Sequence, residues 1–137
     1  MEYGKAIVAI VEYEGKILVG KKIKKPGHPL SEHWHIPGGR VRDDKTNEEA
    51  ISRELKEEAG LDVKIIKFIE ERQVEENKMI ARWYLCRALH NDLKAGDDLS
   101  DVQFIERGEV RSLCSEIGVS LWPPKVVDYF SRESRIS

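Results

Sequence analysis

The segment from Thr46 to Gly60 carries both the start signal and the stop signal of one helix. It opens with T-N-E-E, a capping box in which the Thr46 hydroxyl accepts from the third backbone amide and Glu49 reaches back. The residues up to Ala59 include no glycine or proline, and Gly60 stands where a left-handed residue commonly ends a helix. The sequence therefore predicts a helix over residues 47–59.

One face of this predicted helix is apolar and requires a partner. Ile51, Leu55 and Ala59 recur at a spacing of four, which places them on one stripe that would bury against a sheet. The chain supplies segments of strand-type composition at 6–12, 16–21, 34–36, 63–74, 79–88 and 101–105. We expect the first two, and likewise the fourth and fifth, to form hairpins across short turns. A final helix is expected over residues 125–130, and the length of 137 residues predicts a single domain spanning 1–137.

Charge, hydropathy and cysteine content exclude several classes of function. The 23 basic and 25 acidic residues nearly cancel, so no broad positive surface for an extended nucleic acid is expected. The longest apolar run, Ala6 to Val11, has six residues, whereas a membrane span needs about 20. Cys86 and Cys114 form no paired motif, which is typical of buried thiols in a reducing compartment. We therefore expect a cytoplasmic protein with no membrane partner.

The near-neutral total hides two unlike segments. Residues 1–42 hold eight basic and four acidic side chains, whereas residues 43–76 hold twelve acidic and six basic ones. Within the acidic segment, Glu54, Glu57 and Glu58 converge on one stripe of the predicted helix, where like charges destabilise it. A divalent cation would relieve this repulsion, and Mg²⁺ prefers carboxylate oxygens. The alternative is a solvated acidic helix face.

The residues flanking this stripe favour the metal site. From Gly39 the chain reads GRVRDDKTNEEAISRELKEEAGL, which resembles the Nudix box, G-x5-E-x7-R-E-U-x-E-E-x-G-U with U aliphatic. The positions in register are Gly39, Arg53, Glu54, Leu55, Glu57, Glu58, Gly60 and Leu61. One position departs, because Lys45 stands where the family has its first glutamate. The preceding hairpin and the residues I-P-G-G also resemble the family's lead-in.

The resemblance to the Nudix (MutT-like) hydrolases implies a fold and a reaction. The implied fold is an α/β class α/β/α sandwich with a mixed β-sheet. The implied reaction is Mg²⁺-dependent hydrolysis of the pyrophosphate linkage in a nucleoside diphosphate derivative, with Mn²⁺ as a substitute metal. Metal ions neutralise phosphate oxygens and acidify bound water, while a carboxylate accepts its proton. The expected partner is a small nucleotide.

The resemblance also implies roles for individual residues. The implied metal ligands are Glu54, Glu57, Glu58 and the main chain of Gly39. Glu54 or Glu57 would act as general base, and Arg53 would orient a glutamate through a bidentate contact. The implied substrate contacts are Gly38, Gly39 and Arg40.

Assignments outside the box are weaker. Asp97 and Asp98 lie in a region from which family members sometimes supply a further acid, with a solvated pair of acids in a turn as the favoured alternative. The lysines of residues 21–25 are basic enough to meet an anionic substrate, with plain solvation as the alternative. His35, in a short strand, is expected to pack rather than bind. The free edges of the predicted hairpins leave a homodimer open.

Three functions compete at this stage. The first is hydrolysis of a nucleoside triphosphate to the monophosphate and pyrophosphate, favoured because so short a chain has no second domain for a larger substrate. The second is an ADP-ribose or nucleotide-sugar pyrophosphatase. The third is a nucleotide-binding Nudix domain that Lys45 has made catalytically weak.

Overall fold

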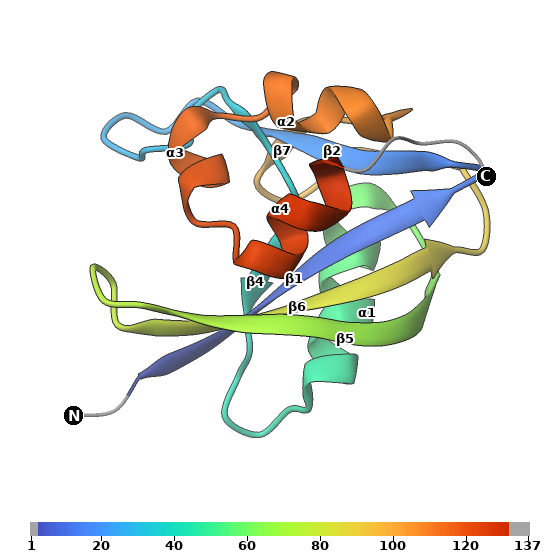
Figure 1. Cartoon of the computed structure of the whole chain (residues 1–137). Helices are drawn as coiled ribbons and strands as arrows, with labels where there is room; N and C mark the ends of the chain where they lie inside the picture. The colour runs from blue at the N-terminus through green and yellow to red at the C-terminus, as the bar shows by residue number, and fades with distance from the viewer. Residues whose placement is uncertain (1–2, 132–137) are drawn as a thin grey trace.

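A computed structural model describes residues 3–131 of the chain. These residues form one mixed sheet with helices on both sides (Figure 1). The strands are β1 (Gly4–Tyr13), β2 (Lys16–Lys22), β3 (Trp34–His35), β4 (Gly38–Arg40), β5 (Val63–Val74), β6 (Met79–Ala88) and β7 (Leu99–Glu106). The helices are α1 (Asn47–Ala59), a 3-10 turn at Arg107–Glu109, α2 (Val110–Leu113), α3 (Glu116–Ser120) and α4 (Pro124–Ser131).

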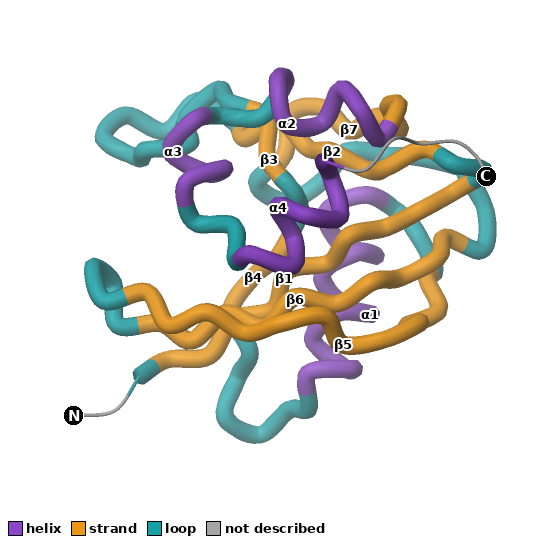
Figure 2. The backbone as a smooth tube through the Cα atoms, viewed as in Figure 1, coloured by secondary structure: helices purple, strands orange, loops and turns teal. Residues whose placement is uncertain are grey.

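Strand β1 is the centre of the sheet, whose order is β3-β2-β1-β6-β5. It runs parallel to β6 along nearly its whole length and antiparallel to β2 at the tight turn that joins them. Further along, β1 also pairs antiparallel with the short strand β4, while β7 pairs with β2 (Figure 2). The parallel and antiparallel pairs together make the sheet mixed, as expected.

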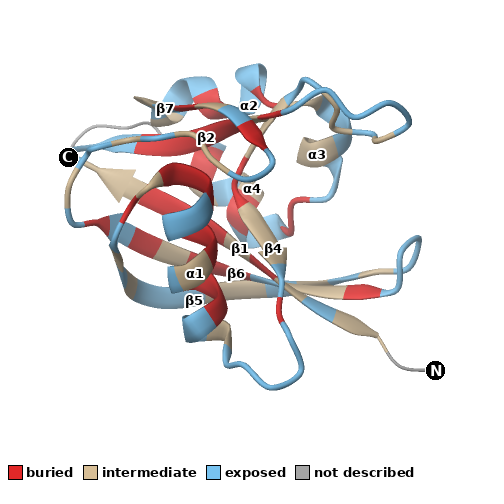
Figure 3. Ribbon diagram, turned by 180° about the vertical axis from the view of Figure 1, so that it is seen from behind, coloured by how far each residue is buried: buried red, intermediate tan, exposed pale blue. Residues whose placement is uncertain are grey.

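Alternate side chains of β1 feed two separate hydrophobic cores. Ile7, Ala9 and Val11 face α1 and pack against the apolar stripe predicted for that helix. Ile10 faces the opposite side, where it packs with Val126 and other residues of the α4 layer. Figure 3 shows the buried face of α1 turned toward the sheet and its exposed face turned to solvent. The result is a helix layer on each side of the sheet.

The capped helix predicted from the sequence is confirmed at both ends. Thr46 Oγ1 accepts from Glu49 N at 3.1 Å, and Thr46 N donates to Glu49 Oε1 at 2.9 Å. At the other end Gly60 has a φ of 72°, a left-handed conformation that glycine adopts without strain. The core contacts then fix the rotation of α1, so the positions of its carboxylates follow.

The two hairpins are also confirmed, with β5 and β6 at their predicted bounds. The sequence missed β4, because its glycines carry no strand signal and its partner β1 lies about thirty positions earlier. It also missed α3 and underestimated β7 by several residues. None of the helices in residues 3–131 has the length and apolar character needed to cross a lipid bilayer.

Removing the capping hydroxyl should destabilise the domain. Thr46→Ala leaves the amide of Glu49 without its acceptor, so the free energy of unfolding should fall by about 1 kcal/mol. Urea denaturation followed by circular dichroism measures this change. Ser52→Ala, on the exposed face of α1, is the matched control and should change stability by much less. Equal effects of the two substitutions would mean that the cap does not define this helix.

Candidate functional site

Helix α1 carries two carboxylates into the protein interior. Glu54 is 7% exposed and Glu58 is 6% exposed, whereas Glu57, which lies between them on the same turn, has a half-exposed side chain. Glu54, Glu58 and Lys22 are the buried charged residues of the part of the chain described. Burying a charge is costly unless it is paired or binds a metal, so this position of the acids requires compensation.

Gly39 and Arg53 provide part of that compensation. A Cβ atom at position 39 would lie 2.5 Å from Cδ of Glu54, so any other residue there would displace this carboxylate. Arg53 Nη2 lies 2.9 Å from Glu54 Oε2, and Arg53 Nη1 donates to Glu57 Oε1 at 3.1 Å. The guanidinium also approaches the carbonyl of Arg40, 3.4 Å away. Arg53 thus holds two glutamates and ties α1 to β4.

The loop after β6 brings a third acid to the same place. Lys94 N donates to Ala59 O, and Gly96 N donates to Glu58 O at 3.1 Å, so the loop satisfies carbonyls at the end of α1. A Cβ at position 96 would lie only 2.4 Å from Glu57 O, which makes glycine necessary for this close contact. The next residue, Asp97, has a φ of 52° and turns back toward the helix.

Glu54, Glu58 and Asp97 form a compact group of carboxylates. One oxygen from each lies within 4.8 Å of the others. Burial, followed by the hydrogen bond and negative charge of Glu54, raises the pKa of Glu58 to about 9. Glu58 Oε1 is buried and has no hydrogen-bond partner among residues 3–131. A close group of oxygen ligands with an unsatisfied carboxyl oxygen fits a hard divalent cation such as Mg²⁺ or Mn²⁺.

The other acids and Lys45 occupy different positions. Glu57 is not part of the carboxylate group and contacts Arg53 instead. Asp98 is not part of the carboxylate group either and forms an ion pair with Lys22, with Nζ 3.3 Å from Oδ2. Lys45 is exposed in the loop before α1, where its charge contributes, after the capping hydrogen bonds of Thr46, to lowering the pKa of Glu49.

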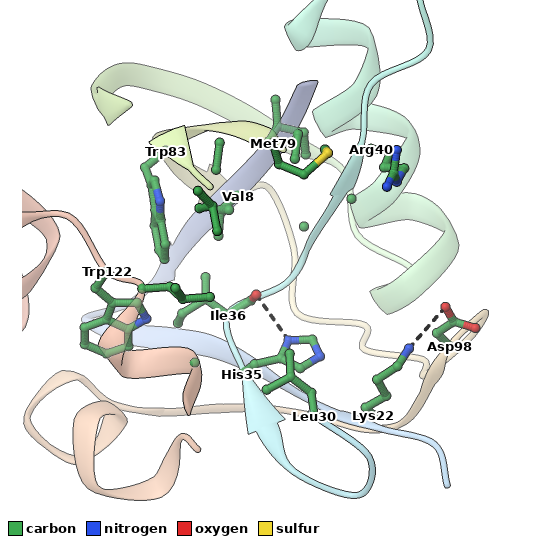
Figure 4. A pocket seen from close by; sticks show the side chains of 18 of the residues that line it. Val8, Lys22, Leu30, His35, Ile36, Arg40, Met79, Trp83, Asp98 and Trp122 are labelled. Atoms are coloured by element: carbon green, nitrogen blue, oxygen red, sulfur yellow. Dashed lines mark hydrogen bonds and ion pairs between the residues drawn. The ribbon is translucent and has the colours of Figure 1, made fainter. Parts of the chain in front are cut away.

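A cavity of about 380 Å³ adjoins the carboxylate group. Figure 4 shows Lys22 and Asp98 on one side of it and Trp83 and Trp122 on the other. Glu58 also lines the cavity and connects it with the buried acids. The three predicted substrate contacts all line it as well: Gly38, Gly39 and Arg40. The cavity therefore has a charged side and an apolar side.

The lining also includes Lys22, His35, Trp83 and Trp122. Lys22 belongs to the run of lysines for which substrate binding and solvation were both considered, and it is 7% exposed because the alternation of β2 places it on the same face as the buried Leu18. His35 was expected to pack, but it lines the cavity. Trp83 and Trp122 are buried and line the cavity. No local sequence signal distinguishes His35, Trp83 and Trp122 as cavity residues.

Comparisons with known proteins agree with this arrangement. The family model of the NUDIX domain matches residues 2–130. The chain is similar to the ADP-ribose pyrophosphatase of Methanocaldococcus jannaschii, with 30% identity over 112 residues that cover 79% of this chain and 64% of that protein. It is also similar to the CTP pyrophosphohydrolase of Escherichia coli, with 29% identity over 75 residues that cover 55% and 54% of the two chains.

The fold itself has close structural counterparts. A NUDIX hydrolase from Nitrosomonas europaea superposes with a TM-score of 0.77 at 19% identity, covering 88% of this chain and 68% of that one. The chain spans less than two thirds of the length of both curated relatives. The comparisons therefore identify the domain and its architecture, including the mixed sheet between helix layers.

The buried acid Glu58 should make the metal-free protein less stable at high pH. Its pKa in the folded chain is raised, so the native state binds more protons, and the stability it contributes at about pH 5 is lost as the pH rises toward 9. The slope from one group reaches at most about 1.4 kcal/mol per pH unit. Glu58→Gln should flatten this dependence, as measured by urea denaturation in the presence of a chelator.

The control for this measurement is Glu76→Gln, which neutralises an exposed acid in the turn between β5 and β6. It should leave the pH dependence of unfolding as in the parent chain. Parallel curves for Glu58→Gln and Glu76→Gln would show that Glu58 titrates as an ordinary surface acid.

Proposed function

The chain belongs to the Nudix family, and on that premise we propose that it hydrolyses the pyrophosphate linkage of a nucleoside diphosphate derivative. The observation that carries this proposal is the group formed by Glu54, Glu58 and Asp97 beside a cavity with one charged and one apolar side. Buried oxygen ligands suit a divalent cation, and the cavity suits a ligand with a charged end and an aromatic end.

Different residues would bind the cation, contact the phosphates and accept the proton of the attacking water. A bound divalent cation would neutralise the phosphate oxygens and lower the pKa of a coordinated water. Glu54, Glu58 and Asp97 would hold that cation, while Arg40 would face the phosphates from the cavity wall. Arg53 fixes the carboxylate of Glu57, which is half-exposed and outside the buried group. We therefore assign Glu57 as the general base that accepts the proton of the attacking water.

Within this class we propose a nucleoside triphosphate as substrate, with the monophosphate and pyrophosphate as products. A cavity of about 380 Å³ is near the lower end of the usual range for ligand sites, about 300–1,000 Å³. It therefore favours a substrate with one nucleoside. The second candidate is ADP-ribose. The relative from Methanocaldococcus jannaschii, which aligns over 112 residues, is named ADP-ribose pyrophosphatase.

A substrate screen tests this proposal directly. The purified chain is incubated with nucleoside triphosphates, ADP-ribose, nucleotide sugars and dinucleotide polyphosphates, each with Mg²⁺ or Mn²⁺. Products are separated by ion-exchange chromatography, which distinguishes pyrophosphate from phosphate. Release of a monophosphate and pyrophosphate from a triphosphate supports the first candidate, and AMP from ADP-ribose supports the second. The proposal fails if no compound is cleaved with either metal.

The assignment of Glu57 predicts a strong and specific loss of rate. Glu57→Gln removes the proton acceptor but keeps the size of the side chain, so kcat should fall about 10²- to 10⁴-fold. Because Glu57 is half-exposed, the thermal unfolding temperature should change little. Glu48→Gln, an exposed acid in the first turn of α1, is the control and should keep full activity. Undiminished turnover by Glu57→Gln would rule out this base.

The position of Lys45 predicts that it does not prevent catalysis. Its charge acts on Glu49 in the first turn of α1, and Asp97 already supplies a third acid to the carboxylate group. The parent chain should therefore turn over at an ordinary enzyme rate, about 1 s⁻¹ or faster. Lys45→Glu should change kcat/KM by less than about fivefold, as for other exposed charges. An inactive parent chain with an active Lys45→Glu variant would instead support a nucleotide-binding role.

A further inference from the structure

His35 is the second residue of β3 and presents a ring nitrogen to the cavity. Its Nδ1 lies 3.2 Å from the carbonyl oxygen of Ile36. Because a carbonyl oxygen only accepts hydrogen bonds, Nδ1 must carry the hydrogen in this contact. The other nitrogen, Nε2, then holds a lone pair when the ring is neutral. This backbone contact therefore fixes the tautomer of His35.

The surroundings of His35 keep the ring neutral. Burial is the main factor that lowers its pKa, and the positive charges of Lys22 and His28 lower it further, against the opposing contact with Ile36. At neutral pH, Nε2 is therefore a hydrogen-bond acceptor. Among residues 3–131, no donor reaches it, so the acceptor remains available to a ligand.

Lys22 supplies a donor on the same side of the cavity. Its ammonium group is buried and contacts Asp98 Oδ2 at 3.3 Å, which leaves further N–H groups of the ammonium for a ligand. Figure 4 shows Nε2 of His35 on the side of the ring that faces Lys22 and Asp98, away from Trp83 and Trp122. The acceptor Nε2 therefore lies between the apolar side of the cavity and the charged side, where Lys22 supplies the donor.

A hydroxyl group matches this pair, because one oxygen can donate to Nε2 and accept from Nζ. In a nucleotide the sugar lies between the phosphates and the base, which is the position of this pair between the acids and the tryptophans. We propose that His35 and Lys22 bind a ribose hydroxyl and thereby select ribonucleotides over deoxyribonucleotides, an inference that rests on the proposed function. A buried polar site that loses its partner hydroxyl discriminates strongly against the analogue.

Nucleotide binding to the metal-free protein tests this selection without any turnover. Ribonucleoside 5′-monophosphates and their 2′-deoxy and 3′-deoxy counterparts are titrated by calorimetry in the presence of a chelator. The parent chain should bind the ribose form about tenfold more tightly than at least one of the deoxy forms. If the 2′-deoxy form binds more weakly, the 2′-hydroxyl is the group that is bound; if the 3′-deoxy form binds more weakly, it is the 3′-hydroxyl. With hydrolysable substrates, the ratio of kcat/KM values should show the same preference.

His35→Phe should bring the ratio of the two affinities close to one, because an aromatic ring remains at this position but the acceptor is lost. Both ligands are compared on the same sample, so a lower folded fraction leaves the ratio unchanged. His33→Phe makes the same change at an exposed position of the adjoining loop and should keep the tenfold preference. If His35→Phe yields no folded protein, Lys22→Met, which removes the donor, should abolish the preference instead.

Three results would overturn the inference. One is equal affinity of the parent chain for ribose and deoxy forms, and another is a preference that follows the base rather than the sugar. The third is the absence of binding by every monophosphate at millimolar concentration. Hydrolysis of triphosphates without sugar selectivity would leave the proposed function intact and remove only this inference. The calorimetric measurement tests this inference even if the chain hydrolyses none of the compounds.

Discussion

The burial of two like charges on one helix is the constraint on which the site depends. Glu54 and Glu58 lie one turn apart and almost fully inside the protein, where burial and the neighbouring Glu54 raise the pKa of Glu58. The apolar stripe of α1 forces this placement, because Leu55 and Ala59 cannot reach the core unless the adjacent acids are carried inward with them. Core packing therefore creates an electrostatic strain that a cation would relieve.

The neighbouring backbone is adapted to that strain at two points. Gly39 leaves room for the Glu54 carboxylate, and Gly96 allows the loop after β6 to contact the last turn of α1. The second contact places Asp97 beside the two glutamates, so the acid that completes the group comes from outside the helix. In this arrangement Lys45, which replaces an acid of the Nudix box, lies at the surface near the helix start.

Short-range signals predicted the helix, its caps and the hairpin of β5 and β6, because each depends on residues that are neighbours in the chain. The pairing of β4 with β1 and the turn of Asp97 toward α1 depend on contacts between distant segments, and no local pattern reports them. Lys22 reads as a surface lysine by composition, but it lies four positions beyond the buried Leu18, so the alternation of β2 turns it inward. The acids of the box and Arg53 could be found by sequence, and Asp97 was one of two candidates for a further acid, but the backbone contacts that bring them together could not.

The two sides of the cavity come from different parts of the chain. The acids belong to α1 and its docked loop, whereas the apolar wall includes Leu30, from the connection between β2 and β3, and Leu121 and Trp122, from the segment before α4. Because these segments share no core position with the buried acids, they are free to diverge without disturbing them. Related chains that descend from one ancestor can thus acquire new substrate preferences while they keep the acids that carry the reaction.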